Sequence, residues 1–177
     1  MYFLFAAFVV VVFLVYVSRR PSSFRYVRSI TISAPASAVF PHVIDFHKWE
    51  AWSPWEKVDP TTRKIYSGSA LGVGANYAWQ GNSKVGSGHM TIIESRPSEF
   101  IRITIEFLKP MKSTNTIEFT FAESGNQTVV THSMFGCNSF LGKLMGLFMD
   151  MEKMVGGQFE KGLASIKQIA EGRARST

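Results

Sequence analysis

The sequence predicts an α+β fold in which a curved antiparallel sheet of about seven strands surrounds a long C-terminal helix, behind a separate apolar N-terminal helix. Three observations predict it. The first 17 residues carry no charged side chain, residues 25–135 alternate between apolar and polar in short runs, and apolar residues recur every three or four positions from residue 138 onward. We expect an anchor at 1–17, a linker at 18–24, one domain at 25–172 and a tail at 173–177.

The N-terminal segment reads as an uncleaved transmembrane anchor. It would span roughly 25 Å as a helix, the short end of the range for crossing a bilayer. Tyr2 and Tyr16 lie near its ends, where aromatic side chains meet membrane interfaces. A cleaved signal peptide is one alternative, but it would begin with basic residues and end with small ones. A buried core helix is the other, but a helix without a polar face is rare in a small domain.

The positive charge is concentrated just after this segment. Arg19, Arg20, Arg25 and Arg28 supply four of the six net positive charges. They favour contact between residues 1–28 and anionic membrane lipids, and they predict a single-pass protein whose domain is cytoplasmic. No clustered basic stripe remains on the domain, so nucleic-acid binding is not expected.

The domain begins with a strand at about 25–33, in which Tyr26, Ile30 and Ile32 fall on one side. A helix is expected from Ser33 or Pro35 to Ile44. Residues 45–60 hold three tryptophans among turn-forming residues, which indicates a short helix and a packed loop. That loop is either a structural plug or one wall of an entrance.

Six further strands are expected, and short connections between them make the sheet antiparallel. Gly81-Asn82 and Gly125-Asn126 are hairpin-turn signals. The expected strands are Arg63–Tyr66, Ala75–Gln80, Val85–Ser95, Phe100–Phe107, Ser113–Phe121 and Thr128–Phe135.

One long amphipathic helix is expected from Asn138 or Ser139 to Ala170, following the apolar positions Phe140, Leu144, Phe148, Met151 and Val155 onward. Gly156-Gly157 inside it indicates a bend, a break or a close backbone contact. This helix is the only large apolar partner for the sheet, and a curved sheet around it would leave a tapering space.

Five stretches carry a resemblance to the polyketide cyclase/dehydrase and lipid-transport family, part of the SRPBCC or START-related superfamily. They are residues 28–35 with Val39-Phe40, 52–55, 88–94, 130–134 and 162–167. The resemblance implies a helix-grip fold around an apolar ligand cavity, without a shared catalytic motif. The family often has tryptophan where this chain has His132, so a polar group would stand where an apolar wall is expected.

We expect the inward-facing residues to line this cavity, although each of them could equally be ordinary core. The candidate lining residues are Trp52, Trp55, Tyr77, Trp79, Met90, Ile92, Glu94, Ile103, Ile105, Phe107, Ile117, Phe119, Phe121, His132, Met134, Phe148, Met151 and Val155.

His132 and Glu94 are the candidate catalytic residues, because alternation places both on the inner face. They could form a satisfied buried pair, a polar handle for a ligand, or a general base assisted by Tyr77. The four histidines have no metal-ligand spacing and Cys137 is the only cysteine, so neither a metal, a cofactor nor an intrachain disulfide is expected.

The function that the sequence favours is membrane-anchored binding or transfer of a hydrophobic small molecule such as a lipid, an isoprenoid or a polycyclic compound. One alternative is a cyclase or dehydratase-like lyase that acts on an apolar substrate in the same cavity. The other is an interaction module held at the membrane without a ligand.

Overall fold

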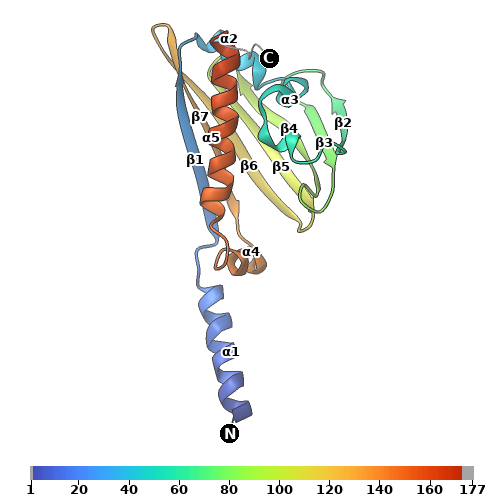
Figure 1. Ribbon diagram of the computed structural model, residues 1–177, viewed down its shortest axis with the longest axis vertical. Helices are drawn as coiled ribbons and strands as arrows, with labels where there is room; N and C mark the ends of the chain where they lie inside the picture. Colours follow the sequence, from blue (N-terminus) through green and yellow to red (C-terminus); the bar gives the residue numbers. More distant parts are fainter. Residues whose placement is uncertain (1, 173–177) are drawn as a thin grey trace.

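The computed structural model describes residues 2–172 and has an α+β fold with one curved antiparallel sheet (Figure 1). The strand order is β1-β7-β6-β5-β4-β3-β2, so every strand except β1 lies beside its sequence neighbour. The C-terminal helix crosses one face of the sheet, as predicted. The strands are β1 Ser23–Ile32, β2 Arg63–Gly68, β3 Ala75–Gln80, β4 Ser87–Arg96, β5 Phe100–Lys109, β6 Ser113–Ser124 and β7 Gln127–Cys137.

Short helical segments fill the connection between β1 and β2. The expected helix after β1 is shorter than predicted, because Pro41 follows its first turn and the chain tightens into a 3-10 turn there. The segments are α2 Ala36–Val39, η1 Phe40–His42, η2 Phe46–Lys48, α3 Trp49–Trp52 and η3 Pro54–Lys57.

The N-terminal helix α1 spans Tyr2–Ser18 and projects away from the sheet (Figure 1). The prediction of a transmembrane anchor is wrong, and so is the single-pass membrane location with a cytoplasmic domain that rested on it. The helix has 17 residues, and no helix within residues 2–172 has the length and apolar character needed to cross a bilayer. Its side chains from Tyr2 to Tyr16 are exposed, which also excludes a buried core helix.

Two helices stand where one was predicted after β7. α4 spans Phe140–Met145 and α5 spans Met151–Ala170, with residues 146–150 between them. Asp150 begins α5 by accepting a hydrogen bond from the Lys153 amide through its side chain. The apolar positions continue through the break, so their spacing did not reveal it. The predicted tail at 173–177 lies outside the described residues.

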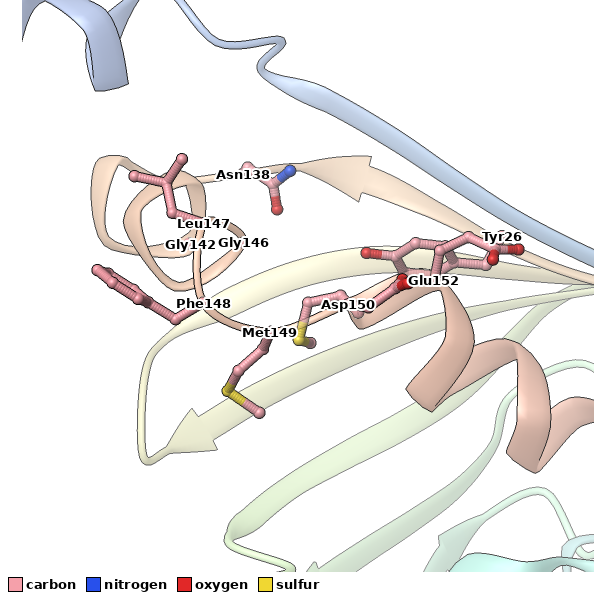
Figure 2. Close-up of a pocket in the computed structure, with 10 residues that line it drawn as sticks. Tyr26, Asn138, Gly142, Gly146, Leu147, Phe148, Met149, Asp150 and Glu152 are labelled. Carbon is pink, nitrogen blue, oxygen red and sulfur yellow. The ribbon is translucent and has the colours of Figure 1, made fainter.

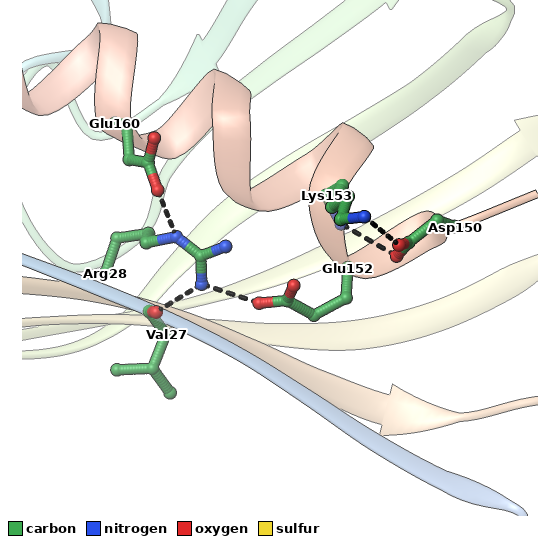
Figure 3. Close-up of polar contacts among 6 residues, drawn as sticks. All are labelled: Val27, Arg28, Asp150, Glu152, Lys153 and Glu160. Atoms are coloured by element: carbon green, nitrogen blue, oxygen red, sulfur yellow. Dashed lines mark hydrogen bonds and ion pairs between the residues drawn. The ribbon is translucent and has the colours of Figure 1, made fainter.

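Gly156 is the position in α5 that permits close contact with the sheet. A Cβ there would overlap the guanidinium of Arg28 on β1. Arg28 Nε donates to Glu160 at 2.6 Å, and Arg28 Nη1 lies 2.7 Å from Glu152 (Figure 3). The glycine pair therefore marks a close contact at Gly156, one of the three alternatives that the sequence left open. At Gly157 a Cβ would meet open space.

The core lies between α5, residues 45–60 (the tryptophan segment) and the concave face of the sheet. Trp49 and Trp52 are buried, and their indole N–H groups donate to the carbonyl oxygens of Val43 and His42. Trp52 also packs against α5 at Gly162, where a Cβ would lie 3.4 Å from its ring. These two tryptophans cover the part of the concave face around Phe119, against which both rings pack.

Candidate functional site

Cross-strand pairing assembles the concave face from rows of residues, one from each strand. One row joins Met134, Ile117, Ile103 and Ile92 to Tyr26 on β1. The neighbouring row consists of Phe24, Gly136, Asn115, Ile105, Met90, Tyr77 and Tyr66. The two rows form a mainly apolar surface that crosses the sheet.

A hollow of about 420 Å³ opens beside these rows, between β1 and the α4–α5 segment. Figure 2 shows Tyr26 at one end of the hollow and Leu147 and Phe148 at the other. Burial, followed by the charges of Glu152 and Asp150, raises the pKa of the Tyr26 phenol. The remaining lining residues are Asn138, Gly142, Gly146, Met149 and Met151.

Asn115 places a carboxamide on this apolar surface. Its exposed fraction is 6%, and its Oδ1 has no hydrogen-bond partner. Its Nδ2 has a single weak contact, 3.5 Å to Ser113 Oγ. Asn115, Tyr26 and Gly136 were not among the site residues predicted from the sequence. Alternation along β6 does place Asn115 on the side of Ile117 and Phe119, and that signal could have identified it.

His132 is buried on the concave face of β7. Its ring stacks between Phe119, at 4.1 Å between centroids, and Phe159 of α5, at 3.7 Å. Its Nε2 has no hydrogen-bond partner. Desolvation by burial lowers the pKa of His132 to about 3, so the ring is neutral at pH 7. The packing matches a core residue better than a base that exchanges protons with solvent.

The structure does not bring Glu94 to His132. The register of β4 against β5 shifts between Ile92 and Glu94, so the bulge turns Glu94 to the outer face. There it forms an ion pair with Arg102, which also pairs with Glu118 at 2.9 Å. The prediction that Glu94 faces inward is wrong, because simple alternation fails at the bulge.

Tyr77 is also unavailable to assist His132, because its hydroxyl is bonded to another residue. Its hydroxyl donates to Glu56 Oε1 at 2.8 Å, and Glu56 Oε2 lies 2.6 Å from Lys64 Nζ. Burial, and then the hydrogen bond to Glu56, raise the pKa of the Tyr77 phenol strongly. The Tyr77 hydroxyl therefore stays protonated, and it already donates its hydrogen bond to Glu56.

The other predicted lining residues divide by burial. Trp55 is 42% exposed and Phe148 is 80% exposed, so neither faces the interior. Phe148 and Met151 line the hollow. Trp79, Phe107, Met134 and Met151 are partly buried. The buried ones are Trp52, Met90, Ile92, Ile103, Ile105, Ile117, Phe119, Phe121 and Val155.

The outer face of the sheet has a hollow of its own. A second open hollow of about 700 Å³ lies on β2–β4 and is lined by residues that include Ile65, Asn76 and His89. Within residues 2–172, no three side chains of His, Cys, Asp or Glu gather in a way that could hold a metal ion.

Solved structures share the fold at low sequence identity. The Zhui aromatase/cyclase from Streptomyces sp. R1128 is 13% identical, with a TM-score of 0.62 over 87% of this chain and 97% of that one. The Aha1 dimer from Colwellia psychrerythraea is 16% identical, with a TM-score of 0.59 over 84% and 96%. Protein CV1439 from Chromobacterium violaceum is 15% identical, with a TM-score of 0.58 over 85% and 97%.

Among curated proteins, no sequence match is found. A family model does match, over residues 23–171, which include the whole sheet, α4 and α5. Its description is polyketide cyclase / dehydrase and lipid transport. The match covers most of the chain and agrees with the fold of the solved structures. The chain therefore belongs to the polyketide cyclase / dehydrase and lipid transport family.

Proposed function

We propose that this protein binds an apolar small molecule on the concave face of its sheet, with entry through the hollow between β1 and the α4–α5 segment. The hollow is the observation that carries the proposal. It is open to solvent, and Tyr26 on its wall belongs to a row that continues through Met134 and Ile117. An apolar ligand that enters there gains burial against this surface, worth about 25 cal/mol per Å².

The family supports binding or transfer as the activity, because its description includes lipid transport. The α4–α5 segment supports entry at this place. Phe148 and Met149 are exposed, and residues 146–150 join two helices without being helical themselves. A segment with few buried contacts can move aside at small free-energy cost, and methionine adapts to ligands of varied shape.

A cyclase or dehydratase-like reaction is the second candidate, and the unpartnered Nε2 of buried His132 favours it. Three observations weigh against it. A base with a pKa of about 3 is poorly matched to proton abstraction at neutral pH. Glu94 is on the outer face, and the Tyr77 hydroxyl is bonded to Glu56. Binding without catalysis is the function that we put forward.

The proposal is tested by blocking the hollow in the full chain. We expect the neutral dye Nile red to bind saturably, and we expect Met151→Trp to weaken its binding at least 5-fold by filling the hollow. Met154→Trp is the matched control, because Met154 is on the same helix, is 42% exposed and does not line the hollow.

Native mass spectrometry of the gently extracted protein should also detect a copurified apolar molecule. Absence of saturable dye binding in the unmodified chain would contradict the proposal. The interaction module would then be favoured, since Phe140, Leu141 and Phe148 expose apolar surface.

We also propose that residues 1–28 contact membrane lipids without crossing the bilayer. The support is the exposed apolar surface of α1, followed by the exposed Arg19. Arg28 contributes little, since it pairs with Glu152 and Glu160. The full chain should float with vesicles that contain anionic lipid, and Arg19→Glu should reduce the floating fraction. Equal flotation of both proteins would contradict a role for Arg19.

A further inference from the structure

We infer that Asn115 is a recognition group that accepts a hydrogen bond from the ligand, so that the preferred ligands are apolar molecules bearing a hydroxyl group, such as a long-chain or polycyclic alcohol. This inference rests on the proposed binding function and narrows its ligand class.

Asn115 carries a buried amide oxygen that has no hydrogen-bond partner. Asn115 lies between Ile105 and Gly136 in its row, and its Oδ1 has no partner although the side chain is more than nine-tenths buried. Buried polar atoms are nearly always paired in native structures, because an unpaired one loses its hydration without compensation. An apolar residue of similar shape would avoid this loss. The position therefore suits a partner that the protein itself does not supply.

Gly136 determines the surroundings of this amide oxygen. Gly136 on β7 is the cross-strand neighbour of Asn115, and a Cβ there would overlap Asn115 Oδ1. The glycine thus allows the amide oxygen to lie against the bare backbone of β7. The next residue in the row is Phe24 on β1, which stacks on Tyr26 in the wall of the hollow at 4.9 Å. The unpaired oxygen and the hollow are therefore separated by one strand.

The unpaired acceptor determines the chemical class of the ligand that it would bind. A carboxamide oxygen only accepts hydrogen bonds, and a hydroxyl group is the simplest donor that an apolar molecule can carry. Ethers and ketones have no donor. In this orientation of the amide, Nδ2 lies 3.5 Å from Ser113 Oγ and Oδ1 is the atom without a partner. The opposite orientation would present N–H groups and would prefer a ketone, so the choice of ligand reports which way the amide faces.

The test is displacement of Nile red from the full chain by three molecules with similar apolar chains: decan-1-ol, 1-methoxydecane and decan-2-one. The measured quantity is the ratio of the inhibition constants of the ether and the alcohol. We expect Asn115→Leu to reduce this preference for the alcohol by about 10-fold while the ether still binds. Gly136→Ala should have the same effect, because its methyl group displaces the amide oxygen.

Asn76→Leu is the matched control. Asn76 is on the opposite face of the sheet, donates to Thr91 Oγ1 at 2.8 Å and lines the second hollow. It should leave the ratio unchanged, and a change would place the dye in that second hollow and overturn the inference. Far-UV circular dichroism checks that each variant is folded. If Asn115→Leu does not fold, Gly136→Ala tests the inference in its place.

The possible failures are distinguishable. If neither alcohol, ether nor ketone displaces the dye, the proposed binding function fails and the inference fails with it. If they bind but the ratio is the same in Asn115→Leu and in the unmodified chain, the binding function stands and the inference is wrong. A preference for the ketone over the alcohol also contradicts it.

Discussion

At the scale of single residues, two buried polar atoms on one concave face have different surroundings. His132 is held between two aromatic rings, which compensates part of the desolvation of its ring through stacking. Asn115 has only a weak contact to Ser113. We therefore assign His132 to the core and Asn115 to recognition, and the two assignments predict different responses to substitution.

His132 should make the stability of the fold depend on pH. Its pKa is lowered from 6.5 to about 3 by burial, so below pH 6.5 the unfolded state binds a proton that the folded state does not. Stability is then lost as the pH falls from 6.5 towards 3, by up to about 1.4 kcal/mol per pH unit. His132→Phe removes this loss. In urea unfolding, the free energy of unfolding of the variant relative to the unmodified chain should rise by about 2 kcal/mol from pH 7 to pH 5.

The control for this measurement keeps His132 in place. Asn76→Leu should follow the pH dependence of the unmodified chain, since Asn76 lies on the other face of the sheet. The free energies of unfolding of His132→Phe and the unmodified chain are compared at pH 7 and pH 5. If they differ by the same amount at both pH values, His132 is not held neutral by burial.

Glu94 should be dispensable for ligand binding. Its carboxylate pairs with Arg102 on the outer face, and its side chain is 42% exposed. Glu94→Gln should therefore change the free energy of unfolding by less than about 1 kcal/mol. Nile red affinity should be the same within twofold. A large loss of affinity in a folded Glu94→Gln variant would return Glu94 to the candidate site.

At the scale of secondary-structure elements, α5 is held against β1 through the contact between Gly156 and Arg28. In an exposed helix interior, replacing glycine by alanine stabilises by about 1 kcal/mol. The two adjacent glycines should not behave alike. A Cβ at Gly157 meets no atom within 4 Å, whereas a Cβ at Gly156 would overlap the guanidinium.

We predict that Gly157→Ala stabilises the fold by about 0.5–1 kcal/mol. Gly156→Ala should stabilise the fold less than this, or destabilise it. In the second variant the displaced guanidinium loses its contacts with Glu152 and Glu160. Urea unfolding of the two variants measures the difference. Removing the guanidinium first, by Arg28→Ala, should restore the gain from Gly156→Ala. If Gly156→Ala and Gly157→Ala stabilise the fold equally while Arg28 is present, the close contact between Gly156 and Arg28 is contradicted.

At the scale of the whole molecule, alternation along single strands predicted the sheet well. In β5, Ile101, Ile103 and Ile105 face the core as their spacing indicated. The failures come from features that no local pattern records. The bulge after Ile92 depends on pairing with β5, and the break before α5 interrupts the helix without interrupting its apolar spacing.

The candidate site was predicted only in part, for the same physical reason. An inward-facing asparagine can be read from alternation, but its lack of a partner depends on which side chains the fold brings to it. The N-terminal helix exposed another limit. Its apolar composition was correctly recognised, yet no helix within residues 2–172 combines the length and apolar character that a transmembrane span needs.

Binding of an apolar molecule between the sheet and α5 can be followed at the methionine methyl groups. Met134 and Met90 belong to the two concave rows, Met151 lines the hollow, and Met154 is exposed outside it. The measurement is a titration of the methyl-labelled full chain with decan-1-ol, followed by NMR. We expect the Met134 and Met151 signals to shift saturably while the Met154 signal stays in place. Saturable shifts at Met154 alone, or no saturable shift at any methionine, would contradict binding at this place.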